Sequence, residues 1–146
     1  MNKNVIISLT GLQYAEEEQE APIEVITFGQ HYIKDGEHFL FYDEMQENGQ
    51  PVKCRIRFTD NRLEMNKHDA TGTRLLFVPG EEFLTSYPTP YGMIFVGLLT
   101  HSVELLEQDD FIRAKIVYGL EINNEKASDC TLFLKVQSCE KPEQLS

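Results

Sequence analysis

The feature of this sequence that most restricts its fold is an alternation of apolar and polar residues, repeated in short blocks along the chain. The clearest block covers residues 52–58, in which one face carries Val52, Cys54, Ile56 and Phe58 and the other carries Lys53, Arg55 and Arg57. A period of two places successive side chains on opposite faces of a β-strand. No window of about 12 residues shows the i, i+3, i+4, i+7 spacing of an amphipathic helix. The pattern therefore predicts an all-β protein.

Similar blocks recur at 5–10, 62–66, 112–122 and 130–136, with turn residues such as Asp60-Asn61 and Asn123-Asn124 between them. Both residue types tolerate positive φ, which suits tight hairpins. The spacing predicts about eight to ten strands joined mainly to their neighbours. Because closing such a sheet removes its exposed edges, we expect a closed, antiparallel, up-and-down β-barrel. The chain of 146 residues fits one domain, 1–146, with an acidic loop near 15–21 and a frayed tail at 139–146.

The charge and composition restrict the partners. A net charge of −11 disfavours broad contact with nucleic acid or with an anionic membrane surface. The sequence has no apolar run of about 18 residues and no secretory signal pattern, so a cytoplasmic location is the expectation. Three cysteines without paired spacing indicate neither a disulfide framework nor a zinc site, and we expect Cys54 and Cys130 to be reduced core residues. No metal or cofactor is predicted.

Basic residues gather between positions 53 and 74 despite the acidic whole. The segment holds six basic residues against three acidic ones: Lys53, Arg55, Arg57, Arg62, Lys67 and Arg74, against Asp60, Glu64 and Asp69. Like charges that face each other across strands are destabilising, so counter-charges are required. They come either from this protein or a second subunit, which is the favoured interpretation, or from an anionic ligand.

A second unusual segment, Tyr91–Leu99, is apolar at consecutive positions and not at alternate ones. A strand of a single-layered barrel should have one wet face, so an apolar outer face suggests that something covers it. A homodimer interface is one interpretation, with Ile94, Val96 and Leu98 as candidate interface residues. Gly97 is expected to mark a bend or a bulge.

The segment Tyr87-Pro88-Thr89-Pro90-Tyr91-Gly92 precedes and overlaps that strand. Its prolines fix the backbone, so it is interpreted either as a rigid corner or as a barrel rim whose phenols contact a ligand. It resembles the Tyr-x-Thr-Pro-Tyr-Gly signature of the YwiB-like family, small bacterial domains of unknown function. Further matching positions are Gly11, Gln13, Thr27-x-Gly29-x-x-Tyr32, Tyr42-x-Glu44, Phe77, Gly80, Thr100 and Tyr118-x-Leu120-x-Ile122-Asn123. The resemblance covers essentially the whole chain, and it implies a calycin-type, lipocalin-like barrel and no particular activity. Lys67-His68-Asp69 departs from the family's Arg-x-Gly pattern.

No catalytic constellation is readable in the sequence. The four histidines, His31, His38, His68 and His101, are scattered singly, and Tyr42-Asp43-Glu44 is interpreted as an ordinary strand end and not as an acid–base pair. Two hypotheses of function remain, with an enzyme a distant third. The first is a binding module that holds a small molecule in its barrel, with Tyr42, Tyr87, Tyr91 and Tyr118 as candidate ligand-binding residues. The second is a homodimeric interaction or structural protein that acts through its outer surface.

Overall fold

The protein is described from a computed structural model, which covers residues 3–14, 23–45, 49–68 and 72–139. All regular elements within these ranges are β-strands, ten in number. They are β1 (Lys3–Tyr14), β2 (Ile23–Lys34), β3 (Glu37–Met45), β4 (Pro51–Thr59), β5 (Arg62–Lys67), β6 (Arg74–Phe77), β7 (Glu82–Thr89), β8 (Gly92–Glu107), β9 (Phe111–Ile122) and β10 (Glu125–Ser138). The predicted acidic loop near 15–21 and the tail beyond Cys139 lie outside the described residues.

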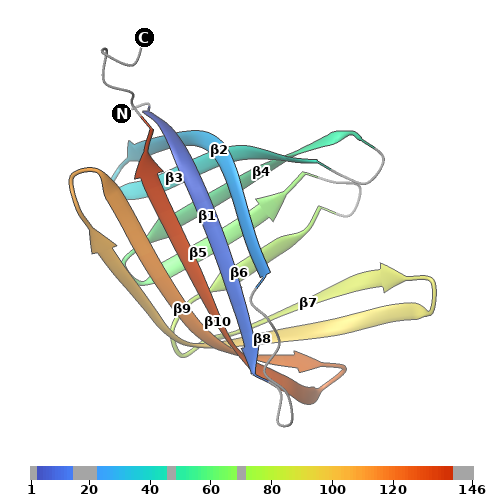
Figure 1. Cartoon of the computed structure of the whole chain (residues 1–146). Coiled ribbons are helices and arrows are strands. Elements are labelled where there is room, and N and C mark those ends of the chain that lie inside the picture. The colour runs from blue at the N-terminus through green and yellow to red at the C-terminus, as the bar shows by residue number, and fades with distance from the viewer. Residues whose placement is uncertain (1–2, 15–22, 46–48, 69–71, 140–146) are drawn as a thin grey trace.

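One antiparallel sheet contains all ten strands, in the order β6-β5-β4-β3-β2-β1-β10-β9-β8-β7. Strands that follow each other in sequence thus pair, except β6 and β7, which form the two edges of the sheet, and β1 pairs with β10 in the middle of the sheet (Figure 1). The predicted all-β, antiparallel, up-and-down fold is confirmed, and the strand number falls within the predicted range.

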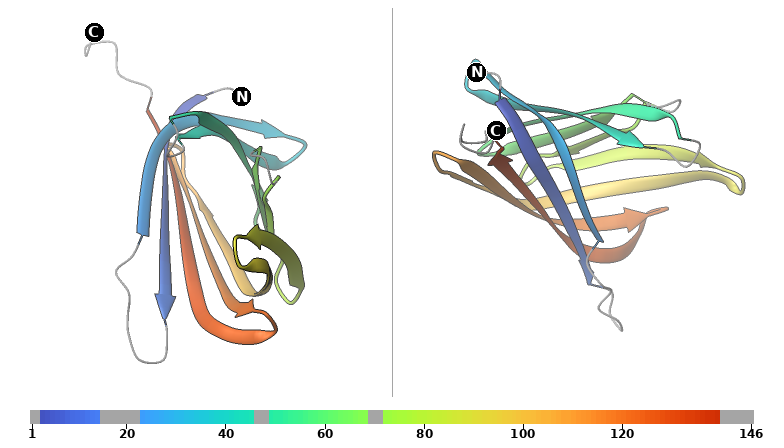
Figure 2. Two further views of the ribbon diagram at one scale, coloured as in Figure 1. Left: turned by 90° about the vertical axis from the view of Figure 1, so that its right-hand side faces the viewer. Right: turned by 45° about the horizontal axis from the view of Figure 1, so that its top comes forward.

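The sheet curls around its interior and nearly closes on itself (Figure 2). The end strands β6 and β7 follow each other in the chain, and the turn between them contacts β8. The Gly80 amide donates a hydrogen bond to the Thr100 carbonyl (2.9 Å), and the Thr100 amide donates one to Glu81 (3.3 Å). These bonds hold the two ends of the sheet near each other, so the molecule is a ten-stranded, nearly closed barrel.

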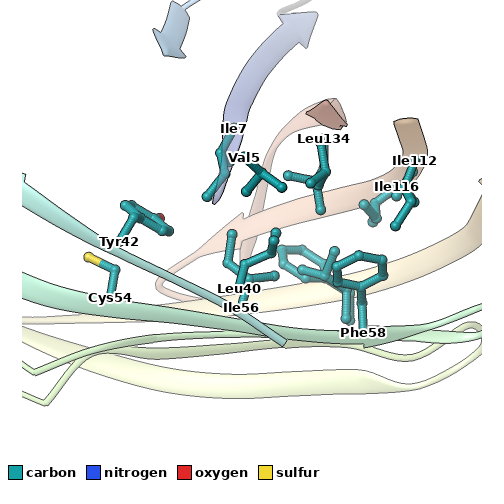
Figure 3. Packing of buried hydrophobic residues seen from close by; sticks show 14 of the residues in the cluster. Val5, Ile7, Leu40, Tyr42, Cys54, Ile56, Phe58, Ile112, Ile116 and Leu134 are labelled. Carbon is teal, nitrogen blue, oxygen red and sulfur yellow. The ribbon is translucent and has the colours of Figure 1, made fainter. Parts of the chain in front are cut away.

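The interior of the barrel is filled toward the end that carries the β2–β3, β4–β5 and β8–β9 turns. Leu40, Ile56 and Phe58 from β3 and β4 face Ile7 and Leu134 from the opposite wall (Figure 3). All five are essentially inaccessible to solvent. The alternation read from the sequence thus places the apolar residues inward, as expected. Cys54 and Cys130 are buried free thiols, which confirms the prediction that they are core residues.

The turns agree only in part with the sequence interpretation. Asn123 and Asn124 have positive φ values of 52° and 68° and form the β9–β10 turn, as predicted. Asp60-Asn61 connects β4 to β5, but neither residue adopts positive φ. The register shift in β8 falls between Thr100 and Ser102, so Gly97 does not mark a bulge, which was one of the two alternatives predicted for it.

Candidate functional site

The main irregularity of the barrel wall is an opening between β2 and β3. These strands pair from their hairpin turn as far as Gly29, which faces Tyr42. Beyond this pair, β2 continues beside β1 to Ile23, while β3 continues beside β4 to Met45. The two strands therefore diverge (Figure 1), and a hollow of about 550 Å³ lies where they separate. Residues of β2, β3 and β4 line it.

Gly29 lies where the two strands separate, and its lack of a side chain allows the close approach there. A Cβ atom on this residue would lie 2.6 Å from the Phe41 carbonyl oxygen, 2.7 Å from Ile7 Cδ1 and 3.2 Å from Tyr42 Cβ. Real side chains do not tolerate such contacts, so the backbone geometry at the edge of the opening depends on a glycine.

The hollow is bounded on the barrel side by Tyr42 and Cys54, which face each other on β3 and β4 (Figure 3). Cys54 Sγ donates a hydrogen bond to the Val52 carbonyl oxygen (3.7 Å). Burial, with the nearby Cys54 and Glu44 as smaller causes, raises the pKa of Tyr42 above its ordinary value. Burial is also the largest cause of the raised pKa of the Cys54 thiol. Both groups thus remain protonated near neutral pH, and the site offers them as neutral hydrogen-bonding groups.

The rim of the opening is apolar to an unusual degree. Phe28 on β2 is 74% exposed, and Ile26, two residues earlier on the same face of the strand, is also largely exposed. Phe41 on β3 is partly exposed and packs edge-on against Tyr32, with 5.5 Å between ring centroids. Polar groups of the same hollow include Thr27 and an ion pair, Lys53–Asp43, at 3.8 Å. The opening therefore combines apolar walls with a few polar groups, which is the usual composition of a small-molecule site.

The four tyrosines predicted to bind a ligand do not gather at one site. Tyr42 borders the opening, whereas Tyr118 lies in the barrel interior, where its ring packs at 4.9 Å against that of Phe77. Tyr91 is 99% exposed at the β7–β8 turn, away from the barrel interior. The side chain of Tyr87 lies outside the described parts of the chain. Pro90-Tyr91 forms the turn itself, because Thr89 ends β7 and Gly92 (φ 114°) begins β8.

The segment Tyr91–Leu99 has an apolar outer face, but the inward and outward residues differ from those expected. Leu98 is 3% exposed and belongs to the core, where it pairs with inward-facing Phe83 of β7. Val96 is partly buried and packs against the same core. The prediction that Val96 and Leu98 point outward is therefore wrong. Ile94, two residues before Val96 and on the same face of the strand, is half-buried. The outward, exposed residues are Met93, Phe95 and Leu99.

Five of the six cations of the basic hairpin, between positions 53 and 74, have ion-pair partners among the described residues. Glu64 is buried, and its carboxylate accepts a 2.6 Å hydrogen bond from Arg74 Nε while lying 3.8 Å from Arg55 and 3.9 Å from Arg57. Further ion pairs are Arg57–Glu37 at 3.3 Å and Lys67–Glu44 at 2.9 Å. The interpretation that the basic residues find counter-charges within the protein is confirmed for Lys53, Arg55, Arg57, Lys67 and Arg74.

Two histidines that the sequence interpretation treated as isolated form a buried, hydrogen-bonded pair, and one of them contacts an exposed glutamate. His31 Nε2 lies 3.0 Å from His38 Nδ1, and His38 Nε2 lies 2.6 Å from a carboxylate oxygen of Glu107. His38 also stacks on Phe58 at 4.8 Å. A cavity of about 110 Å³ adjoins this group. Within the described ranges, no group of three or more His, Cys, Asp or Glu side chains is arranged to hold a metal ion.

A signal for the histidine pair was present in the sequence. Asp35-Gly36 is a strong hairpin turn signal, and both residues have positive φ. A turn at these two residues places His31 and His38 diagonally across two strands on the same face. Glu107 comes from β8, far along the chain, and no local pattern indicates its position.

Comparison with known proteins agrees with this architecture. A family model described as a domain of unknown function, DUF1934, matches residues 7–134. The chain belongs to this family. A solved structure, the ywiB protein from Bacillus subtilis, resembles it with a TM-score of 0.78 and 18% sequence identity, over 94% of this chain and 92% of that chain. The resemblance to YwiB-like domains is thus confirmed, and at this identity the structural match shows the fold alone. A search of curated proteins finds no match, and no helix in the described residues is long and apolar enough to cross a membrane.

Proposed function

We propose that this protein is a binding module that holds a small, largely apolar molecule in the opening between β2 and β3. The observation that carries the proposal is that strand pairing stops at Gly29 and Tyr42 while both strands continue, which leaves a hollow of about 550 Å³ in the barrel wall. This volume lies within the range of about 300–1,000 Å³ that small-molecule sites occupy.

The chemistry of the opening supports an apolar ligand with a polar group. Phe28 and Phe41 supply exposed aromatic surface at the rim, where a bound molecule would remove it from water. The protonated Tyr42 and the hydroxyl of Thr27 supply hydrogen-bonding groups that would orient the ligand. The packed half of the barrel leaves less space, since Leu40, Ile56 and Phe58 fill it. The proposed ligand therefore lies in the wall of the barrel and not at its centre.

The test is a fluorescence titration with the neutral apolar probe N-phenyl-1-naphthylamine. Phe28→Ser removes a rim side chain that is 74% exposed, so the fold is retained. Covering part of this ring is worth about 1 kcal/mol, and we expect about fivefold weaker binding of the probe. The matched control is Phe95→Ser, which removes an exposed phenylalanine from the outer face of β8. Equal weakening in both variants, or no binding to the unmodified protein, contradicts the proposal.

A second function, homodimerisation through β7 and β8, is favoured by a separate observation. Met93, Phe95 and Leu99 are exposed on the outer face of β8, and Leu84 is exposed beside them on β7. An apolar face of this kind is typical of protein–protein contact surfaces. Sedimentation of the unmodified protein at micromolar concentration should show a dimer, and Phe95→Glu should yield monomers. A monomeric unmodified protein removes this candidate.

A further inference from the structure

A second hollow, of about 470 Å³, lies on the outer face of the sheet over β1, β10, β9 and β8. The strand register defines its floor as two adjacent rows of outward side chains. One row crosses the sheet as Ser8, Lys135, Arg113 and Leu106, and the next as Thr10, Phe133, Lys115 and Glu104. This surface, called here the β8–β10 face, is separate from the opening between β2 and β3.

Arg113, Lys115 and Lys135 on this face form no ion pair among the described residues. Two carboxylates also line the hollow: Glu104 faces Lys115 across β8 and β9, and Glu24 lies on β2. Arg113 and Lys135 face each other directly across β9 and β10, an arrangement that is destabilising without a counter-charge. The basic hairpin shows the contrast, because there Glu64 lies within ion-pair distance of Arg74, Arg55 and Arg57.

Apolar side chains adjoin these cations. Phe133 pairs with Lys115, and Leu106 pairs with Arg113, so each row of the floor places a partly exposed apolar residue beside a cation. The Arg113 guanidinium also lies 5.0 Å from the centre of the Phe111 ring, which limits the positions it can take. A ligand that fits this surface carries a negative charge next to an apolar group.

We propose that the β8–β10 face binds a small organic anion, a carboxylate, sulfonate or phosphate that carries an apolar group. Arg113 and Lys135 hold the anionic group between them through charge-assisted hydrogen bonds, and Phe133 and Leu106 contact the apolar group. The net charge of −11 favours a free small molecule over a polyanion. A nucleic acid or an anionic membrane meets the repulsion of the whole acidic surface. One small anion meets mainly the charges of this hollow, three cations against Glu24 and Glu104, because salt screens charges more than about 10 Å away.

The experiment uses two probes and a charge-matched control. The anionic probe 8-anilinonaphthalene-1-sulfonate is titrated by fluorescence into the unmodified protein and into the double variant Arg113→Gln/Lys135→Gln. The control is Lys34→Gln/Lys126→Gln, which removes the same charge from exposed sites elsewhere. We expect at least tenfold weaker binding of the anionic probe in the first variant, at most a twofold change in the control, and weaker binding as salt rises.

The neutral probe separates this proposal from the proposed function, because it should bind the Arg113→Gln/Lys135→Gln variant as it binds the unmodified protein. An unchanged or equally reduced affinity of the two double variants for the anionic probe overturns the anion site, whatever the neutral probe shows. Cosedimentation with phosphatidylglycerol vesicles that is lost in Arg113→Gln/Lys135→Gln also overturns it, since the partner would then be a membrane surface.

Discussion

Replacing Glu64 by glutamine should destabilise the protein, because Glu64 is a buried counter-charge shared by three arginines of the basic hairpin. Its side chain is 6% exposed, and three arginines approach it, with Arg74 at 2.6 Å and Arg55 and Arg57 at 3.8 and 3.9 Å. Glutamine keeps the shape and one hydrogen-bond acceptor but removes the charge. Arg74 and Arg55 would then lose this counter-charge, and Arg57 would keep only its ion pair with Glu37.

The size of the effect follows from burial. Removing one member of a fully buried ion pair costs about 3–5 kcal/mol. The arginine side chains here are 29–46% exposed, so water replaces part of the lost interaction. We therefore expect a loss of about 2 kcal/mol in the free energy of unfolding. In a chain of this length, that corresponds to a fall in Tm of about 4–8 °C.

Thermal unfolding followed by circular dichroism at several pH values checks both the size and the cause. Burial raises the pKa of Glu64, but the hydrogen bond and charge of Arg74, with smaller contributions from Arg57 and Arg62, outweigh it, so the pKa is lowered overall. A carboxylate with a lowered pKa contributes stability above its unfolded-state pKa of about 4.3, and this stability is lost as pH falls through the folded-state pKa. The difference between the two proteins should thus be present at pH 7 and shrink in acid.

The control for this measurement is Glu81→Gln, at an exposed residue of the β6–β7 turn. A Tm of Glu64→Gln within about 1 °C of that of the unmodified protein at pH 7 would refute the reasoning. A larger loss that stays constant down to pH 3 would show that packing, and not charge, is responsible.

Two further predictions concern the opening and the interior. Gly29→Ala should lower the free energy of unfolding by about 1–3 kcal/mol, because its Cβ would lie 2.6 Å from the Phe41 carbonyl. Urea denaturation checks this against Gly11→Ala, where nothing lies within 4 Å of an added Cβ, and equal losses would contradict it. Burial raises the pKa of Tyr42, so the stability that depends on its protonated form is present below pH 10 and lost above it. Tyr42→Phe should therefore lose less stability between pH 8 and pH 11 than the unmodified protein in the same assay, and an identical loss would count against this account.

The fold was largely predictable because its information is local. Alternation in 52–58 and 112–122 identifies the inward face of each strand, and Asn123-Asn124 marks a turn, since these signals depend on residues close in sequence. In Tyr91–Leu99 both faces are apolar, so a period of two cannot decide which face is inward, and the predicted orientation of Val96 and Leu98 was wrong for that reason.

The candidate site was much less predictable. Tyr42 was identified, but the opening beside it results from the divergence of β2 and β3 at Gly29, which depends on how the whole sheet curls. Charge pairing has the same limit. The sequence shows that 53–74 is basic and that Arg113 and Lys115 share an outer face. It does not show that Glu64 lies among three arginines of the first group, or that the second group forms no ion pair in the described part of the chain.

The central claim, that the opening between β2 and β3 is a binding site, is tested most directly by mapping the neutral probe on the protein by NMR. In a titration of ¹⁵N-labelled protein with N-phenyl-1-naphthylamine, the account predicts that amide shifts concentrate at Thr27–Gln30, Phe41–Asp43 and Lys53–Cys54, the lining of the hollow. Shifts concentrated instead on β7 and β8, around Leu84 and Phe95, would contradict it and would transfer the search for function to the outer apolar face.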